Sequence, residues 1–253
     1  MISFTEAQLL AWLTPVLWPF LRALALFTAL PVMGARNVPA RVRVALAALV
    51  ALCAQPVLPP MPHVALDSPL AFMLVVQQVL IGVTIGFAVR VVFAAVEYAG
   101  ELIGLQMGLN FAMFFDPVTN NQATTTARLF NTTVSWLFIV ANGHLLVVMA
   151  LVDSFNAFPV GPEPFAFLRQ TMPHQWGAEV FGTGLWIALP LVALMVFVNI
   201  ALGVISRVAP QLSLFSVGFP ITIGLGLVGL IFTLPALQTP FMMAMERLLS
   251  SLR

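Results

Sequence analysis

The sequence predicts an all-α, polytopic membrane protein. Of its 253 residues, 61% are hydrophobic and only 8% are charged, whereas a soluble globular protein carries about 25% charged residues. The mean hydropathy is +1.04. A folded chain with so few polar groups cannot cover its surface with them in water. Lipid or partner subunits must therefore cover the remaining apolar surface.

Apolar runs of about 20 residues, the length that crosses a bilayer as a helix, define the expected segments. The clear runs lie at about 8–33, 69–96, 127–152, 180–206 and 213–237. A shorter run at 43–58 and a glycine-rich stretch at 98–115 are further candidates. Hydropathy thus predicts about six segments, and the distribution of loop arginines favours an N-terminus outside the cytoplasm.

Several charged residues interrupt these apolar segments. A charge inside a membrane helix costs about 2.5–3.5 kcal/mol on insertion scales, so it usually faces protein or water. Glu97 and Glu101 are four residues apart, and Arg90 lies on the same helical face. We interpret these three as a polar seam that orients subunits, the alternative being side chains that extend toward the lipid interface. Both interpretations stay open for Arg22 and Arg128.

Glycines recur every four residues before a break in the helical pattern. Gly100, Gly104 and Gly108 form a smooth stripe on which another helix can pack closely. Gly82 and Gly86 repeat the spacing. The alternative for both sets is ordinary packing within the chain.

The glycine stripe runs into a segment rich in methionine and phenylalanine, which ends at Asp116-Pro117 because a residue before proline leaves the helical region. Non-helical backbone at membrane depth persists only where protein buries it or where it lines a cavity. Methionine fills irregular gaps, and hydrophobic constrictions can close a channel by dewetting. We therefore predict a deformable plug here, the alternative being an interfacial anchor or core packing. Its apolar residues are Met107, Phe111, Met113, Phe114 and Phe115.

Other classes of function lack their signatures. The net charge of +1 argues against a nucleic-acid surface. His63, His144 and His174 are scattered without ligand spacing, so we expect no metal and no cofactor. No nucleophile elbow or convergent catalytic set is present, so we expect no enzyme. A small-molecule transporter is a weaker alternative, because we find no internal repeat of the kind many transporters show.

Two long stretches of the chain have distinctive sequences. The first runs from Ala99 to Ala112 and is closed by Asp116-Pro117, and the second runs from Arg207 to Pro220. Both resemble the signatures of the FliR family of flagellar export-gate subunits. The likeness covers nearly the whole chain. It extends to Arg22, Pro31, Arg36, Val38-Pro39, Arg41, Arg43, Asn142-Gly143-His144, Asp153 and Pro159.

The resemblance implies a single FliR-like domain over 1–253, built of helical hairpins. About 1–178 would be FliP-like in fold and about 179–253 FliQ-like. With FliP-like and FliQ-like subunits it would form the pore of a type III export gate, in the bacterial inner membrane at the flagellar basal body. FlhA and FlhB would cooperate, and unfolded flagellar proteins would pass through. The homologous subunit of a virulence secretion system is the alternative. In such an assembly many helices lie outside the bilayer plane, which would lower the number of crossings.

The resemblance also implies roles for particular residues. The pore loop of the family matches Gln106 to Gln122, and Arg207 matches a residue in contacts between subunits. The residues expected in the pore loop are Gln106, Met107, Gly108, Leu109, Asn110, Phe111, Met113, Phe114, Phe115, Asp116 and Pro117.

Overall fold

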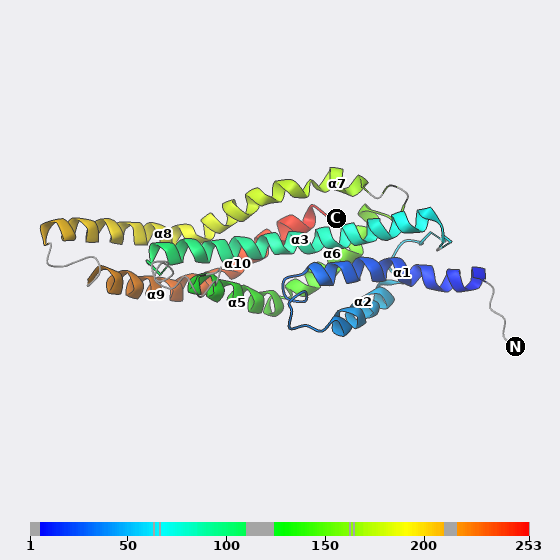
Figure 1. Cartoon of the computed structure of the whole chain (residues 1–253), viewed down its shortest axis with the longest axis horizontal. Helices are drawn as coiled ribbons and strands as arrows, with labels where there is room; N and C mark the ends of the chain where they lie inside the picture. Colours follow the sequence, from blue (N-terminus) through cyan, green and yellow to red (C-terminus); the bar gives the residue numbers. More distant parts are fainter. Residues whose placement is uncertain are drawn as a thin grey trace. The chain divides into compact units, whose positions relative to one another are not determined.

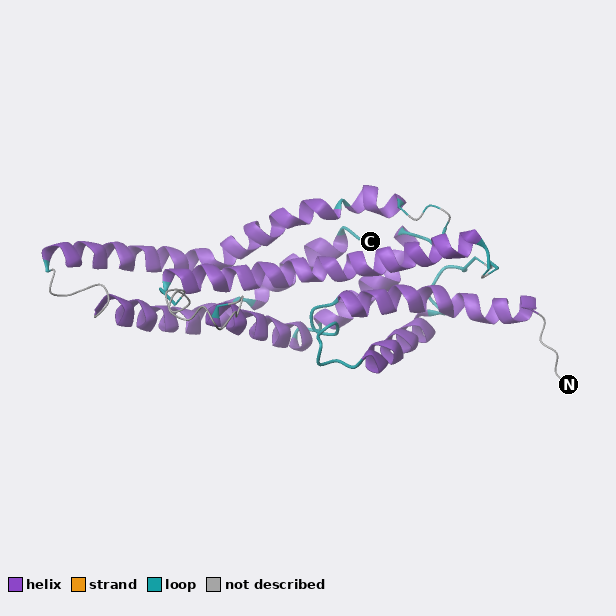
Figure 2. Cartoon of the chain, in the orientation of Figure 1, coloured by secondary structure: helices purple, strands orange, loops and turns teal. Residues whose placement is uncertain are grey.

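The described part of the chain consists of helices joined by turns and loops and contains no strand (Figure 2). The structure is a computed structural model that describes residues 6–62, 64, 65, 67–109, 124–161, 163, 165–209 and 217–252. Its helices are α1 (Glu6–Ala29), α2 (Ala40–Ala54), α3 (Pro69–Gln106), α5 (Thr125–Val140), α6 (Gly143–Ala157), α7 (Ala166–Thr171), the 3₁₀ turn η1 (Pro173–Trp176), α8 (Gly177–Val208), α9 (Phe219–Ala236) and α10 (Gln238–Ser250) (Figure 1). The prediction of an all-α membrane protein is confirmed.

The chain divides into two compact units that interleave along the sequence. Unit 1 comprises Met1–Arg90, Asn142–Trp176 and Met245–Arg253. Unit 2 comprises Val91–Ala141 and Gly177–Ala244. Helix α3 contributes its first part to unit 1 and its last part to unit 2.

Unit 1 is held together by close packing of α1 on the first part of α3. A methyl group added at Gly82 would overlap the backbone carbonyl of Arg22, and one at Gly86 would lie 2.5 Å from the Cβ of Ala29. These two glycines therefore serve packing within the chain. Nearby, Trp18 is fully buried against Ala71 and Leu74.

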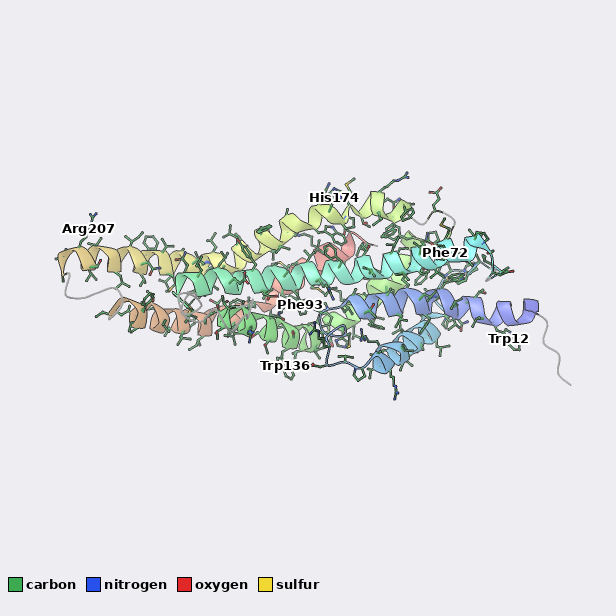
Figure 3. All side chains as sticks on the ribbon, viewed as in Figure 1. Trp12, Phe72, Phe93, Trp136, His174 and Arg207 are labelled. Atoms are coloured by element: carbon green, nitrogen blue, oxygen red, sulfur yellow. The ribbon has the colours of Figure 1, made fainter. Side chains whose placement is uncertain are left out.

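Unit 2 has an aromatic core on the last part of α3. The ring of Phe93, labelled in Figure 3, meets Phe138 of α5 and Phe241 of α10 edge to face, with both centroid distances 5.7 Å. A Cβ at Gly184 would lie 2.6 Å from the Ala95 carbonyl oxygen, so a glycine lets α8 approach α3. Edge-to-face pairs are favoured by the ring quadrupole. Together these contacts fix α5, α8 and α10 on α3.

Among the residues that the structure describes, four helical segments are long and apolar enough to cross a membrane: Trp12–Ala29, Pro69–Gln106, Ala166–Val208 and Phe219–Ala236. The pair α5 and α6 passes only together, as one broken span, which would make five. The window in α3 is 67% buried inside the chain, whereas the windows in Ala166–Val208 and α9 are 22% and 17% buried. The last two segments therefore carry the apolar surface that lipid or other proteins must cover.

The expectation of about six segments was wrong in its details. The stretch 98–115 is no separate segment, because α3 continues without a break to Gln106. Glycine in a helix costs only about 0.5–1 kcal/mol relative to alanine, and tight packing at Gly100 offsets that cost. The run 43–58 forms the 15-residue α2, which is too short to span. The run 127–152 is interrupted at Asn142, whose φ of 58° lies in the left-handed region.

Candidate functional site

The C-terminal end of α3 is a Schellman cap built on Gly108. The Leu109 amide donates to the Gly104 carbonyl and the Gly108 amide donates to the Leu105 carbonyl, both at 3.1 Å. Gly108 has a φ of 78°, the left-handed conformation that such a cap requires and glycine adopts without strain. Gly108, expected in the packing stripe and the pore loop, therefore lies just past the helix and ends it.

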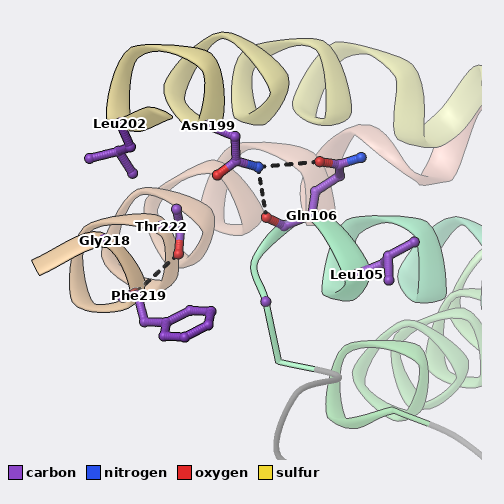
Figure 4. Close-up of a pocket in the computed structure, with 8 residues that line it drawn as sticks. Leu105, Gln106, Asn199, Leu202, Gly218, Phe219 and Thr222 are labelled. Atoms are coloured by element: carbon purple, nitrogen blue, oxygen red, sulfur yellow. Dashed lines mark hydrogen bonds between the residues drawn. The ribbon is translucent and has the colours of Figure 1, made fainter. Parts of the chain in front are cut away.

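Side chains from α8 and α9 bind the next two carbonyls of this turn. The amide nitrogen of Asn199 donates to the backbone oxygen of Gln106 at 3.2 Å and to its side-chain oxygen at 3.3 Å (Figure 4). The hydroxyl of Thr222 lies 3.2 Å from the Met107 carbonyl. It also lies 3.1 Å from the carbonyl of Phe219, in its own helix. Residues far apart in the sequence thus meet at the end of α3.

The side chain of Met107 anchors this turn in the core of unit 2. It is fully buried, and a Cβ at Gly226 of α9 would lie 2.6 Å from its Cε and 2.7 Å from its sulfur. The absence of a side chain at Gly226 therefore makes room for the methionine. Met107, expected in the plug, is in the described structure a core residue between α3 and α9.

A cavity of about 210 Å³ adjoins the end of α3 (Figure 4). Its walls come from the last turn of α3, from α8 and from the start of α9. The lining residues are Leu105, Gln106, Gly108, Asn199, Leu202, Gly218, Phe219 and Thr222. Two residues of the expected pore loop, Gln106 and Gly108, are among them.

The other two glycines of the stripe pack on α5 of the same chain. A Cβ at Gly100 would lie 2.8 Å from the Ala127 Cα and 3.0 Å from the Thr126 carbonyl oxygen, and one at Gly104 would overlap the Thr126 hydroxyl. The N-cap of α5 is Thr124, whose hydroxyl accepts from the Ala127 amide at 3.1 Å. A side chain at either glycine would thus push the first turn of α5 away.

The charged residues expected in a seam fall into different surroundings. In unit 2, Glu97 accepts a hydrogen bond of 3.1 Å from the amide of Asn131 on α5, and Glu101 is partly buried. In the described residues, neither glutamate has a basic side chain within ion-pair distance. In unit 1, the exposed Arg90 donates to the carbonyl of Ala29, the last residue of α1.

Arg207 lies in the last turn of α8 and is exposed (Figure 3). A cation at this end of a helix interacts favourably with the helix dipole. That local effect accounts for an arginine here, and the exposed guanidinium remains accessible to a partner.

Unit 1 contains a polar cluster that the sequence did not single out as one site. The guanidinium of Arg22 is fully buried. It donates to the Gln78 side-chain oxygen at 2.8 Å, to the Ser154 hydroxyl at 2.9 Å and to the Phe158 carbonyl at 3.0 Å. It also lies 3.6 Å from the ring centroid of Phe155, a cation–π arrangement. Extension toward a lipid interface is therefore wrong for Arg22.

A second layer of hydrogen bonds extends this cluster to the chain after α6. The amide of Gln78 donates to Gln77 at 2.9 Å, and Gln77 accepts from the Gly161 amide at 3.2 Å. The signal for these residues was present in the sequence. Gln77 and Gln78 are two adjacent amides inside the apolar run 69–96. Burying an amide costs free energy unless it is hydrogen-bonded, so such a pair indicates that bonding partners lie nearby. Asn199, within the apolar α8, carried the same signal.

The remaining residues of the expected pore loop lie outside the described residues. They are Asn110, Phe111, Met113, Phe114, Phe115, Asp116 and Pro117. Within the described ranges, no group of three or more His, Cys, Asp or Glu side chains is placed to hold a metal ion.

Long apolar helices, glycine-mediated contacts and polar groups bonded inside the protein define a polytopic α-helical membrane protein. Residues 13–248 match the family model of bacterial export proteins, family 1. The chain belongs to this family, that of the flagellar biosynthetic protein FliR.

Three relatives, each a flagellar biosynthetic protein FliR, show the extent of the similarity. The protein of Escherichia coli (strain K12) is 43% identical over 244 residues, which are 95% of this chain and 92% of the relative. That of Pectobacterium carotovorum subsp. carotovorum is 41% identical over 241 residues, again 95% and 92%. That of Bacillus subtilis (strain 168) is 31% identical over 219 residues, 84% of this chain and 83% of the relative.

Proposed function

We propose that this chain is a structural and gating subunit of the flagellar type III export gate. It forms, with FliP-like and FliQ-like subunits, the pore through which unfolded flagellar proteins leave the cell, and it performs no covalent chemistry. The observation that carries the proposal is the 43% identity to an FliR protein over 95% of the chain. The proposed location is the inner membrane at the basal body, with FlhA and FlhB as further partners.

The surface of unit 2 supports assembly with other subunits. Helices α8 and α9 expose large apolar side chains that include Phe197, Ile200, Ile231 and Phe232, with exposed fractions of 60–75%. Such surfaces need lipid or protein cover. Glu97 and Glu101 lack a basic partner in the described residues, and membrane carboxylates normally pair. In the proposal, a cation of a neighbouring subunit supplies that partner, and Arg90 and Arg207 serve as the corresponding cations of this chain.

The proposed gate is the segment 110–117 with its phenylalanines and Met113. Its support is chemical: flexible apolar side chains close a channel to water and ions by dewetting and deform when a polypeptide passes. The described structure adds a fixed starting point, because Leu109 is held by the cap at the end of α3. The proposal also includes the division of the chain into two parts. Residues 1–178 would be FliP-like in fold, and residues 179–253 would be FliQ-like.

The test is a chain that lacks 110–117, assembled with its partner subunits in cells. We expect the assembled gate to leak small ions, measured as loss of membrane potential relative to wild type. Co-purification with the FliP-like and FliQ-like subunits controls for assembly. A deletion variant that assembles in normal amounts and stays as tight as wild type would show that this segment is not the gate.

A further inference from the structure

Every carbonyl in the last turn of α3 has a hydrogen-bond partner, and the partners come from three elements. A helix leaves its last four carbonyls without partners of its own. Here the cap satisfies Gly104 and Leu105 through the amides of Leu109 and Gly108. The carbonyls of Gln106 and Met107 lie within hydrogen-bond distance of Asn199 on α8 and Thr222 on α9. Two other helices therefore help to terminate α3.

The amide nitrogen of Asn199 faces two acceptors of one residue. It lies 3.2 Å from the backbone oxygen of Gln106 and 3.3 Å from its side-chain oxygen, and it has two protons to donate. Asn199 is half-buried in a helix whose neighbouring side chains, Ile200 and Leu202, are apolar. Burying an amide there costs free energy unless it is bonded. The cost of breaking these hydrogen bonds therefore keeps the amide of Asn199 on the two oxygens of Gln106.

The contact of Thr222 differs, because one hydroxyl proton faces two acceptors. The carbonyls of Met107 and Phe219 lie at 3.2 and 3.1 Å, and a hydroxyl has a single proton to donate. The proton can therefore move from the α3 carbonyl to that of its own helix without leaving the hydroxyl unbonded. This bond can be released at little cost, whereas the bond of Asn199 cannot.

We infer that Asn199 and Thr222 are positioning residues that fix where the gate segment leaves α3, an inference that rests on the proposed function. The segment starts directly after Leu109, which the cap holds against the last turn of α3. Met107 belongs to the same last turn of α3, and its buried side chain packs against Gly226 of α9. This contact holds the turn in place from its side-chain face. The α8 and α9 helices thereby set the gate segment's origin.

The first experiment measures the positioning directly, by hydrogen–deuterium exchange on the purified complex with its partner subunits. Asn199→Leu and Thr222→Val remove the donors while nearly conserving shape. We expect the amides of Gly108 and Leu109 to exchange roughly tenfold faster in Asn199→Leu, the factor for about one lost hydrogen bond, with a smaller increase in Thr222→Val.

Matched variants control for general damage to the same helices. Thr222→Ser keeps the hydroxyl, and Ser206→Ala removes from α8 a hydroxyl that bonds, among the described residues, to Gly203 of its own helix. Both should leave the exchange of the two amides at the wild-type rate. Unchanged exchange in Asn199→Leu, or equal acceleration in the controls, overturns the inference.

The second experiment asks whether this positioning governs the gate. We expect Asn199→Leu to raise ion leakage through the assembled complex several-fold, and Ser206→Ala to leave it unchanged. If Asn199→Leu stays tight while the deletion of 110–117 leaks, the positioning inference is wrong and the proposed gate stands. If the deletion itself stays tight, the proposed gate falls, and the role of Asn199 in it falls with it.

Discussion

The two units bury polar groups in opposite ways. In unit 1 a single charged group, the Arg22 guanidinium, binds three neutral acceptors on α3, on α6 and just after α6. At the end of α3 in unit 2, two neutral side chains bind separate residues. Asn199 binds Gln106, and Thr222 faces the carbonyl of Met107 with that of Phe219 as an alternative acceptor. A neutral hydrogen bond contributes only about 0.5–1.5 kcal/mol, and one to a charged group about 1.5–3 kcal/mol. The hydrogen bonds of the first arrangement are therefore the stronger ones, whereas in the second the hydroxyl of Thr222 can exchange one acceptor for another.

Glycines show a contrast between rigid and flexible neighbours that does not follow the boundary between the units. Gly82 and Gly86 in unit 1 and Gly100 in unit 2 lie against backbone or Cβ atoms that cannot move aside. Gly226 lies against the side chain of Met107, whose thioether is flexible. The contact of Gly226 with Met107 can therefore adjust more easily than those of Gly82, Gly86 and Gly100.

The largest expected effect comes from replacing the buried arginine. Arg22→Gln leaves at least one of the three acceptors unsatisfied, because the glutamine amide has two protons to donate, and its shorter side chain opens a cavity beside Phe155. At about 1–3 kcal/mol for each unsatisfied buried group, we expect the free energy of unfolding in detergent to fall by roughly 3–5 kcal/mol. Denaturant titration measures this loss. Arg41→Gln, on the exposed face of α2, should stay within about 0.5 kcal/mol of wild type, and equal losses in the two variants would refute the role assigned to the cluster.

A smaller effect on the free energy of unfolding is expected when glycines are replaced by alanine. Its sign should differ between Gly100, which is packed against α5, and Gly203, which has open space around it. Gly100→Ala places a methyl group 2.8 Å from the Ala127 Cα, an overlap that should cost about 1–3 kcal/mol of unfolding free energy. At Gly203 on α8, an added Cβ would meet no neighbouring atom within 4 Å in the part of the chain that the structure describes. Gly203→Ala should therefore stabilise the isolated chain by about 0.5–1 kcal/mol through helix propensity. The same titration decides, and a loss of similar size in both variants would remove the distinction.

The smallest effect is expected at the cap of α3. Gly108 has a φ of 78°, and a residue with a Cβ pays about 1 kcal/mol to adopt the left-handed region. Gly108→Ala should lower the unfolding free energy by about that amount. Gly108→Asn should lower it less, because asparagine tolerates this conformation. If both variants matched wild type in denaturant titration, the cap would not need its glycine.

Local sequence patterns predicted the helices, the membrane class and the close-packing glycines. Apolar composition and four-residue glycine spacing are local properties, readable without a partner. The continuity of α3 through Gly100 was missed because it depends on α5, which supplies the packing that offsets the glycine cost. The contacts of Asn199 with Gln106 and of Thr222 with Met107 join residues 93 and 115 positions apart. No periodicity within one helix can reveal such pairs.

The Arg22 cluster also sets an order on biogenesis. The acceptors of its guanidinium stand at positions 78, 154 and 158, up to 136 residues after the arginine itself. A ribosome therefore delivers the charge into the nascent chain long before it delivers Ser154 and Phe158. Until then, a helix of the insertion machinery, a chaperone or water must solvate the cation, and the first helix can settle only after more than half of the polypeptide has been translated.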